Sequence, residues 1–312
     1  TRNSKANRSQ DPLSWLKLCY NSSMWFYYAL FFAIWTAIQT FLVKKLTKKI
    51  SPAPLLYLFF IFNIPITFIL LLFLGGVPQV TSNFFLYMGI AGLLYAVAFI
   101  TSYFAISRSQ ISLISPIASF GPVFTTLIAV VTLHEVPAPI KFIGILLIVV
   151  GAYLLNIADV KEGIMAPFKK LFSHKGVLLF LFANFLWSIT PIFQKKAIFE
   201  TTPQIPLFAS LIGMCFVFIF ITPFALRKAI KSLTEVKNNL NIFFLNGAGT
   251  AFSQAAAYAA FSLVFVGYAA SIFRTSPIFV ILLGGIFLKE KRIKERLLGA
   301  SVMLVGAILL AF

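Results

Sequence analysis

The segment "PVFTTLIAVVTLHEVPAPIKFIGILLIVVGAYLL", residues 122–155, occurs in a second version near the end of the chain. Residues 277–310 read "PIFVILLGGIFLKEKRIKERLLGASVMLVGAILL", and the two segments align without a gap. Both copies carry a proline, a glutamate and two glycines seven residues apart at matching positions. A repeated sequence unit predicts a repeated structural unit, so this pair of segments decides the fold.

The composition places the chain in a membrane. Of its 312 residues, 60% are hydrophobic and only 11% are charged, whereas soluble domains carry about 25% charged residues. The net charge of +18 comes from cations that lie mostly between apolar runs. Such cations are typical of the loops of membrane proteins, so we expect no nucleic-acid partner.

The residues that usually carry catalysis or bind metals are scarce. Cys19 and Cys215 are far apart in the sequence, and His134 and His174 each stand alone in a predicted loop. No metal-site spacing, phosphate-binding loop or nucleophile motif occurs. We therefore expect no enzyme activity, no metal and no cofactor.

Ten apolar runs are long enough to cross a bilayer, and in lipid all of them must be helical. The longest interior connection divides the chain into an N-terminal arm (1–23), a first unit (24–157), a linker (158–176) and a second unit (177–312). The sequence thus predicts an all-α membrane protein. The ten predicted spans lie near residues 24–43, 53–74, 83–106, 111–131, 138–157, 177–194, 205–226, 240–264, 266–288 and 295–312.

Five spans in each unit is an odd number, so the second unit must enter the membrane from the opposite side. The distribution of charge agrees, because non-equivalent loops of the two units carry the cations. In a ten-span chain these loops fall on one side, which holds 18 of the 26 cations, against 6 on the other side. Inverted repeats of this kind are the architecture of many secondary transporters.

Further positions match between the units. Tyr103 and Tyr258 each stand two residues before an alanine, and Trp35 and Trp187 begin similar segments, the second with Lys195 eight residues later. With these residues the sequence resembles the EamA-like branch of the drug/metabolite transporter superfamily. The resemblance implies ten transmembrane helices in two inverted five-helix repeats and transport by alternating access. It also implies a central cavity lined mainly by spans one, three, four, six, eight and nine.

The resemblance further implies a multi-pass protein of the plasma (inner) membrane with both termini in the cytoplasm. The charge count puts the cation-rich side opposite the termini, and cations normally mark the cytoplasmic side. The side on which the termini lie is therefore open at this stage.

Arg274 is a cation inside the ninth apolar run. An arginine at the centre of a membrane helix costs about 2.5–3.5 kcal/mol on insertion scales, so it should face a cavity or a partner. None of the eight acidic residues lies well inside a predicted span. We therefore interpret Arg274 as an anchor for a carboxylate or phosphate. A hydrogen bond to the carbonyl of Phe273, which Pro277 leaves free, and snorkelling to the interface are the structural alternatives.

Other polar and aromatic residues within the runs are candidates for a substrate cavity, which needs aromatic walls and a few hydrogen-bonding groups. The structural alternative is hydrogen bonding between helices. Together with Arg274, the candidate substrate-binding residues are Trp35, Gln39, Tyr103, Ser119, Asn184, Trp187, Gln254 and Tyr258.

Glu135 and Glu290 precede the fifth and tenth runs, where a carboxylate would cap a helix N-terminus. A gating ion pair of these acids with Lys141 or Arg292 is the alternative. Gly144, Gly151 and their repeat partners predict a close helix contact, either within the fold or between protomers.

The sequence as a whole predicts a secondary active transporter that moves small organic metabolites, with amino acids and related carboxylate or zwitterionic compounds as the expected substrates. The alternative is an antiporter of phosphorylated or nucleotide-linked metabolites, and a channel or membrane-embedded enzyme is less favoured. The predicted partners are a small-molecule substrate and the lipid bilayer. A coupling proton or a counter-substrate, the direction of transport and the oligomeric state remain open.

Overall fold

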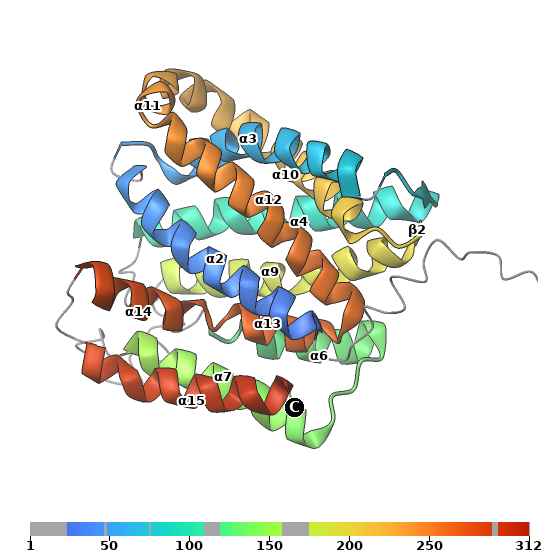
Figure 1. The fold of residues 1–312 in the computed structure, drawn as a ribbon, viewed down its shortest axis with the longest axis vertical. Helices are drawn as coiled ribbons and strands as arrows, with labels where there is room; N and C mark the ends of the chain where they lie inside the picture. Colours follow the sequence, from blue (N-terminus) through green and yellow to red (C-terminus); the bar gives the residue numbers. More distant parts are fainter. Residues whose placement is uncertain are drawn as a thin grey trace, which may run out of the picture.

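A computed structural model describes residues 24–46, 49–74, 76–108, 119–157, 175–288 and 293–311. The described chain is almost entirely helical (Figure 1), as expected where lipid leaves backbone polar groups without other partners. The helices are α2 (Met24–Leu46), α3 (Pro52–Leu74), α4 (Ser82–Arg108), α6 (Gly121–Leu133), α7 (Pro139–Ile157), α9 (Lys175–Phe199), α10 (Pro206–Lys231), α11 (Leu233–Asn238), α12 (Leu240–Leu263), α13 (Val266–Phe273), α14 (Ser276–Leu288) and α15 (Ile293–Ala311).

Four stretches within the described residues are long and apolar enough to cross a membrane by length and composition. They lie in α3, α4, α9 and α10, and α6, α7 and α15 hold shorter apolar stretches. Each of the ten predicted runs overlaps a helix, although the fourth run is described only from residue 119 onward. The N-terminal arm, residues 158–174 of the linker, Glu290 and Arg292 lie outside the described residues.

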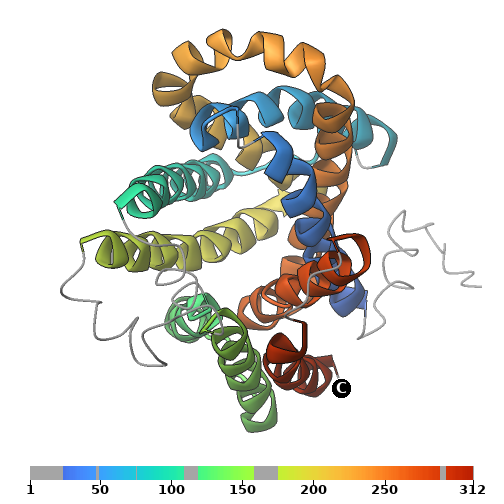
Figure 2. The ribbon, with the colours of Figure 1, turned by 90° about the vertical axis from the view of Figure 1, so that its left-hand side faces the viewer.

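The contacts between helices are reciprocal between the two halves. By the repeat alignment α2, α3, α4 and α7 correspond to α9, α10, α12 and α15. The α4 helix packs along α9, and in the same way α12 packs along α2. The equivalent helices α3 and α10 contact each other, as do α7 and α15 (Figures 1 and 2). Exchanging the halves leaves this set of contacts unchanged, which is the property of a two-fold relation between repeats.

The predicted glycine contact joins α7 to α15 within the chain. A Cβ atom on Gly144 would come within 3.0 Å of the carbonyl oxygen of Gly306, and one on Gly151 within 2.6 Å of that of Gly299. Gly144 and Gly299 are repeat partners, as are Gly151 and Gly306, so the two contacts are the same contact seen from each half. Small residues here let the two backbones approach closely, which favours the intramolecular alternative.

The ninth run, expected to be one helix over 266–288, is two helices. The α13 helix ends at Phe273, a turn holds Arg274 and Thr275, and α14 begins at Ser276. The physical reason is Pro277, which has no backbone N–H to donate to Phe273 and is tolerated only in the first turn of a helix. Arg274 therefore lies at a helix break rather than on the side of a continuous helix.

One end of the helical bundle carries a short antiparallel ladder that the sequence did not indicate. Strands β1 (Gln79–Val80) and β2 (Thr201–Thr202) pair residue by residue. Beside the ladder, the Thr81 hydroxyl donates to the Glu200 carboxylate at 2.5 Å. These contacts join the connection before α4 to the end of α9.

Candidate functional site

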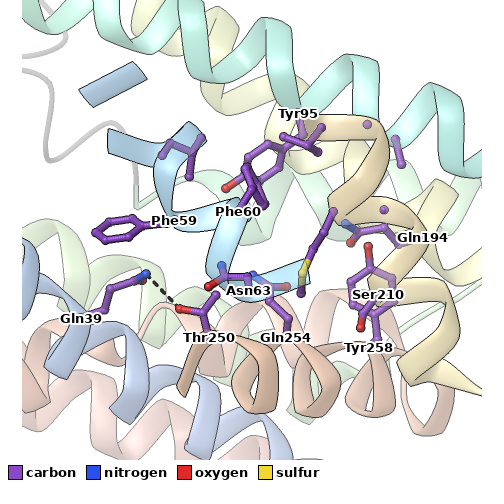
Figure 3. A pocket seen from close by; sticks show the side chains of 16 residues that line it. Gln39, Phe59, Phe60, Asn63, Tyr95, Gln194, Ser210, Thr250, Gln254 and Tyr258 are labelled. Atoms are coloured by element: carbon purple, nitrogen blue, oxygen red, sulfur yellow. Dashed lines mark hydrogen bonds between the residues drawn. The ribbon is translucent and has the colours of Figure 1, made fainter. Parts of the chain in front are cut away.

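A cavity of about 150 Å³ lies among six helices, the first three of each half. This set differs from the spans that the family resemblance implied, because α3 and α10 contribute and no described lining residue comes from α6, α13 or α14. The lining residues are Gln39, Leu56, Phe59, Phe60, Asn63, Ala91, Gly92, Tyr95, Gln194, Ser210, Gly213, Met214, Val217, Thr250, Gln254 and Tyr258 (Figure 3).

Two of the predicted residues fix one wall of this cavity by joining α2 to α12. The Gln39 amide nitrogen donates to the Thr250 hydroxyl at 3.2 Å and to the Asn246 side-chain oxygen at 3.0 Å. The Trp35 indole N–H donates to the same Thr250 hydroxyl at 3.2 Å. Gly249 lies under the indole ring, where any Cβ would overlap it. Trp35 thus stands behind the wall, and Gln39 presents its amide to the cavity.

The opposite wall brings together Gln194, Ser210 and Tyr258 (Figure 3). The Tyr258 hydroxyl fills the space in front of Gly213, where a Cβ would lie 2.6 Å from it. The tyrosine therefore requires a glycine on α10. Tyr258 is nearly fully buried, with 4% of its surface exposed.

Asn63 lies between the two walls in α3. With its amide oriented so that the nitrogen faces carbonyls, it donates to the Phe59 carbonyl at 3.1 Å and to the Gly247 carbonyl at 3.3 Å. This orientation leaves the amide oxygen as an acceptor. The aromatic rings of Phe59, Phe60 and Tyr95 complete the lining around it.

The lining contains no ionised side chain among the described residues. Its polar groups are amides and hydroxyls, which donate and accept hydrogen bonds without carrying charge. A cavity of this kind can bind a polar solute through directional hydrogen bonds and aromatic contact. It offers no counter-ion to a charged group, whose burial without a partner is costly.

Arg274 lies elsewhere, at the break between α13 and α14. Its nearest described hydrogen-bond partner is the Asn184 side-chain oxygen, 3.4 Å from a guanidinium nitrogen. A Cβ on Gly121 would lie 2.7 Å from the same guanidinium, so a glycine lets the arginine approach α6. Ser188 ties these elements together, because its hydroxyl contacts the carbonyls of Gly121 and Asn184. Arg274 and Asn184 are thus together, but neither lines the cavity.

Of the remaining predicted residues, one lines the cavity and the others do not belong to its described lining. Gln254 lines the cavity with Gln39 and Tyr258. Trp187 lies outside the lining but packs against Tyr95, with ring centroids 6.4 Å apart, and its buried indole N–H has no hydrogen-bond partner among the described residues. Ser119 is buried just before α6. The side chain of Tyr103 lies outside the described part of the structure.

Sequence reasoning missed several cavity residues, above all Asn63, Gln194 and Thr250. A signal existed for two of them, because Asn63 and Gln194 are amides close to the in-helix prolines Pro65 and Pro191. Within the described residues, no group of three His, Cys, Asp or Glu side chains gathers as metal ligands would.

A buried ion pair was also missed. The Lys195 ammonium lies 2.5 Å from the Glu135 carboxylate, and both side chains are 8% exposed. The other carboxylate oxygen of Glu135 accepts from the backbone N–H of Val266 at 2.7 Å. Glu135 does cap a helix N-terminus, but that of α13 rather than of the following helix α7. Its cation is Lys195, whereas Lys141 donates to the Leu310 carbonyl.

Comparison with solved structures supports the fold. A crystal structure of another protein superposes with a TM-score of 0.66, covering 92% of this chain and 95% of that chain at 14% sequence identity. At this identity the likeness concerns the fold alone.

Two curated proteins are similar in sequence. The putative sugar uptake protein YxfA of Lactococcus lactis is 28% identical over 255 residues, which cover 78% of this chain and 84% of that protein. The uncharacterized protein MJ1333.1 of Methanocaldococcus jannaschii is 26% identical over 127 residues, 92% of its own length but 41% of this chain. The second relative is thus about one repeat long.

The sequence pattern of the EamA-like transporter family matches residues 23–157 and again residues 174–312. The two matches cover most of the chain and fall on the two halves that the internal repeat delimits. The resemblance drawn from the repeated residues is therefore confirmed, and the chain belongs to the EamA-like transporter family, as a membrane transporter that contains the family unit twice.

Proposed function

We propose that the protein is a secondary transporter that crosses the plasma membrane ten times and moves small organic metabolites by alternating access. Two inverted repeats, residues 24–157 and 177–312, would be joined by the linker 158–176. The reciprocal helix contacts support this arrangement, because a two-fold relation lets the halves exchange roles between two states. The cavity supports it as well, since it lies between the halves and draws on equivalent helices of both.

The substrate that this cavity fits best is a neutral, polyhydroxylated molecule of about the size of a monosaccharide. The observation that carries this proposal is the set of uncharged amides and hydroxyls that lines the cavity together with four aromatic rings. Sugar hydroxyls both donate and accept hydrogen bonds, as do amides, while the rings suit the apolar faces of a sugar. The likeness to a putative sugar uptake protein points to the same class of substrate.

An amino acid or related carboxylate is the second candidate, and the observation that favours it is Arg274. The residue as a whole is half-buried, and its described hydrogen bond goes to an amide rather than a carboxylate. In this version Arg274, Asn184 and the neighbouring Ser119 and Trp187 would hold the carboxylate outside the cavity described above. A phosphorylated substrate fits less well, because Lys195, the one fully buried cation among the described residues, is already paired with Glu135.

The test is solute counterflow into proteoliposomes that contain the full chain. The neutral probes are D-glucose and D-ribose, and the charged probes are L-alanine and L-glutamate. We expect counterflow of a neutral probe, a strong loss in Gln254→Leu and Asn63→Leu, and no loss in the matched control Arg274→Ala. The same vesicles with an imposed pH gradient test coupling to a proton, and exchange against unlabelled solute tests a counter-substrate.

Counterflow of the amino acids alone, abolished by Arg274→Ala, would replace the neutral substrate by the second candidate. Movement of none of the probes, in protein that is monodisperse and reconstituted, would count against both. Counterflow of a neutral probe that is unaffected by Gln254→Leu and Asn63→Leu would show that the solute passes by another route.

A further inference from the structure

Glu135 and Lys195 form a buried ion pair, and each of them also hydrogen-bonds to the end of a helix. The α12 helix ends at Leu263 and α13 begins at Val266, so the chain turns a corner at residues 264–265. Lys195 donates to the Val264 carbonyl at 2.7 Å, and Glu135 accepts from the Val266 N–H at 2.7 Å. Each charged group thus satisfies one of the backbone groups that helix ends leave without a partner.

The signs of the charges suit these helix ends. The C-terminal end of a helix carries partial negative charge and the N-terminal end partial positive charge. The Lys195 cation lies at the C-terminal end of α12 and the Glu135 anion at the N-terminal end of α13. The partial charges of both helix ends therefore favour this arrangement of the two ions. Reversing the two charges would place each of them at the unfavourable pole.

The pair joins three segments that come from both halves of the chain. Glu135 belongs to the connection between α6 and α7 in the first half, while Lys195 and the corner at 264–265 belong to the second half. Lys195 stands near the end of α9 at Phe199, and the chain then passes through Glu200 into the β1–β2 ladder. A movement that separates the halves at this end must break the pair.

The pair also lies near one end of the cavity, although neither of its residues lines it. Gln194, the residue before Lys195, lines the cavity, and so does Tyr258. Tyr258 precedes Val264 by six residues of α12, a distance of about 9 Å along the helix. The pair therefore binds the corner between α12 and α13, roughly two helical turns beyond the cavity wall.

From this placement we propose that Glu135 and Lys195 form a gate of the transport cycle. The pair closes one end of the cavity in the state described here and separates when the cavity opens toward that end. This inference rests on the proposed transport function. A gate of charged groups suits two states, because water can solvate both ions when the end opens, whereas the closed state pairs them and binds them to the helix ends.

The test uses paired cysteines at Val136 and Phe199, whose exposed side chains lie on the segments that carry Glu135 and Lys195. The background lacks Cys19 and Cys215, and the gate residues stay intact. A cleavable bifunctional thiol reagent links the two cysteines in proteoliposomes. We expect the link to stop counterflow of whichever probe the unlinked protein transports, and we expect reduction of the link to restore it. Each single cysteine treated in the same way is the control.

Spin labels on the same two cysteines report the gate without any substrate. Electron paramagnetic resonance of the protein in nanodiscs should show a main short distance and a minor longer one. Lys195→Met and Glu135→Gln should raise the ratio of the longer to the shorter population by about a hundredfold or more, because each removes one partner of a buried pair. The adjacent Lys196→Met is the matched control and should leave the ratio unchanged.

Distinct results overturn the gate and the transport function. Transport that continues across the linked cysteines, or one unchanged distance in the wild type and in both gate variants, refutes the gate and leaves the transporter intact. A broadened single distance in the variants would mean a merely structural pair. If Lys195→Met does not yield monodisperse protein, Glu135→Gln and Lys195→Arg decide the question. Absence of transport in the unlinked wild type refutes the function, while the distances still report the movement.

Discussion

Lys195 and Arg274 are both cations in apolar stretches of the second half, the first within α9 and the second in the turn between α13 and α14, yet their surroundings differ in kind. Lys195 meets a carboxylate at 2.5 Å and a carbonyl at 2.7 Å, and Glu135 completes the set at a helix N-terminus. Arg274 meets an amide oxygen at 3.4 Å beside a glycine. A buried charge that is fully paired holds helices together, whereas a half-buried charge with a neutral partner keeps the ability to bind an anion.

The largest expected effect comes from removing one member of the Lys195 pair. Lys195→Met leaves Glu135 buried without its cation, which should lower the free energy of unfolding by about 3–5 kcal/mol. Adding Glu135→Gln removes the stranded charge and keeps an acceptor for Val266, so the double variant should recover most of the loss. The stability of the single and the double variant is measured by heating each in detergent and recording the fraction of protein that stays monodisperse. Equal stability of single and double variants would contradict the role of the stranded charge.

A smaller loss of stability is expected when a glycine that packs near the Glu135–Lys195 pair is replaced by alanine. A Cβ on Gly267 would overlap the Thr126 hydroxyl and push α13 away from α6, which also displaces the Val266 N–H from Glu135. Gly267→Ala should therefore cost about 1–3 kcal/mol.

The matched substitution at the other cation is Gly121→Ala. It meets the flexible end of the Arg274 side chain, which can move aside, so the melting temperature should fall clearly less than in Gly267→Ala. A larger loss in Gly121→Ala would mean that the guanidinium is held as firmly as the ammonium of Lys195.

Arg274→Ala should have a modest effect on stability. The only described hydrogen bond that the side chain loses is long and goes to a neutral amide, so the free energy of unfolding should fall by less than about 1.5 kcal/mol. Intrinsic tryptophan fluorescence during chemical unfolding measures the loss. A cost as large as that of Lys195→Met would place Arg274 among the structural charges and remove the basis for an anion site.

The smallest effect is expected at an exposed ion pair. Lys49 and Glu235 approach to 2.9 Å, but their side chains are 57% and 29% exposed. Water screens such a pair, so Lys49→Ala should change the free energy of unfolding by about 0.2–1 kcal/mol. The effect should vanish in high salt, while that of Lys195→Met should persist. Thermal unfolding at low and high salt compares the two.

Much of the fold was predictable, because hydrophobic run length and a repeated sequence are local signals. The helices, the division into two halves and the glycine contact followed from such patterns. The break at Arg274 was only partly predictable, since Pro277 permits either a kinked helix or two separate helices. The β1–β2 ladder carried no signal, because two residues in each strand form no periodic pattern.

The candidate site was predictable only where the sequence marked a polar residue as unusual. Gln39, Gln254 and Tyr258 were expected in a cavity and lie in one, whereas Arg274 and Asn184 lie together outside it. The sequence could not separate the two groups, because a polar residue within an apolar run has the same signature whether it faces a cavity or a neighbouring helix.

By itself, then, the amino-acid sequence determined that this protein is a helical membrane protein of two related halves, and it determined the family to which the chain belongs. Only the tertiary structure decided which charges are paired and which polar groups share a cavity. The partners of Lys195 lie 60 and 69 residues away in the chain. Contacts over such separations depend on how helices pack, and neither apolar run length nor helical periodicity carries that information.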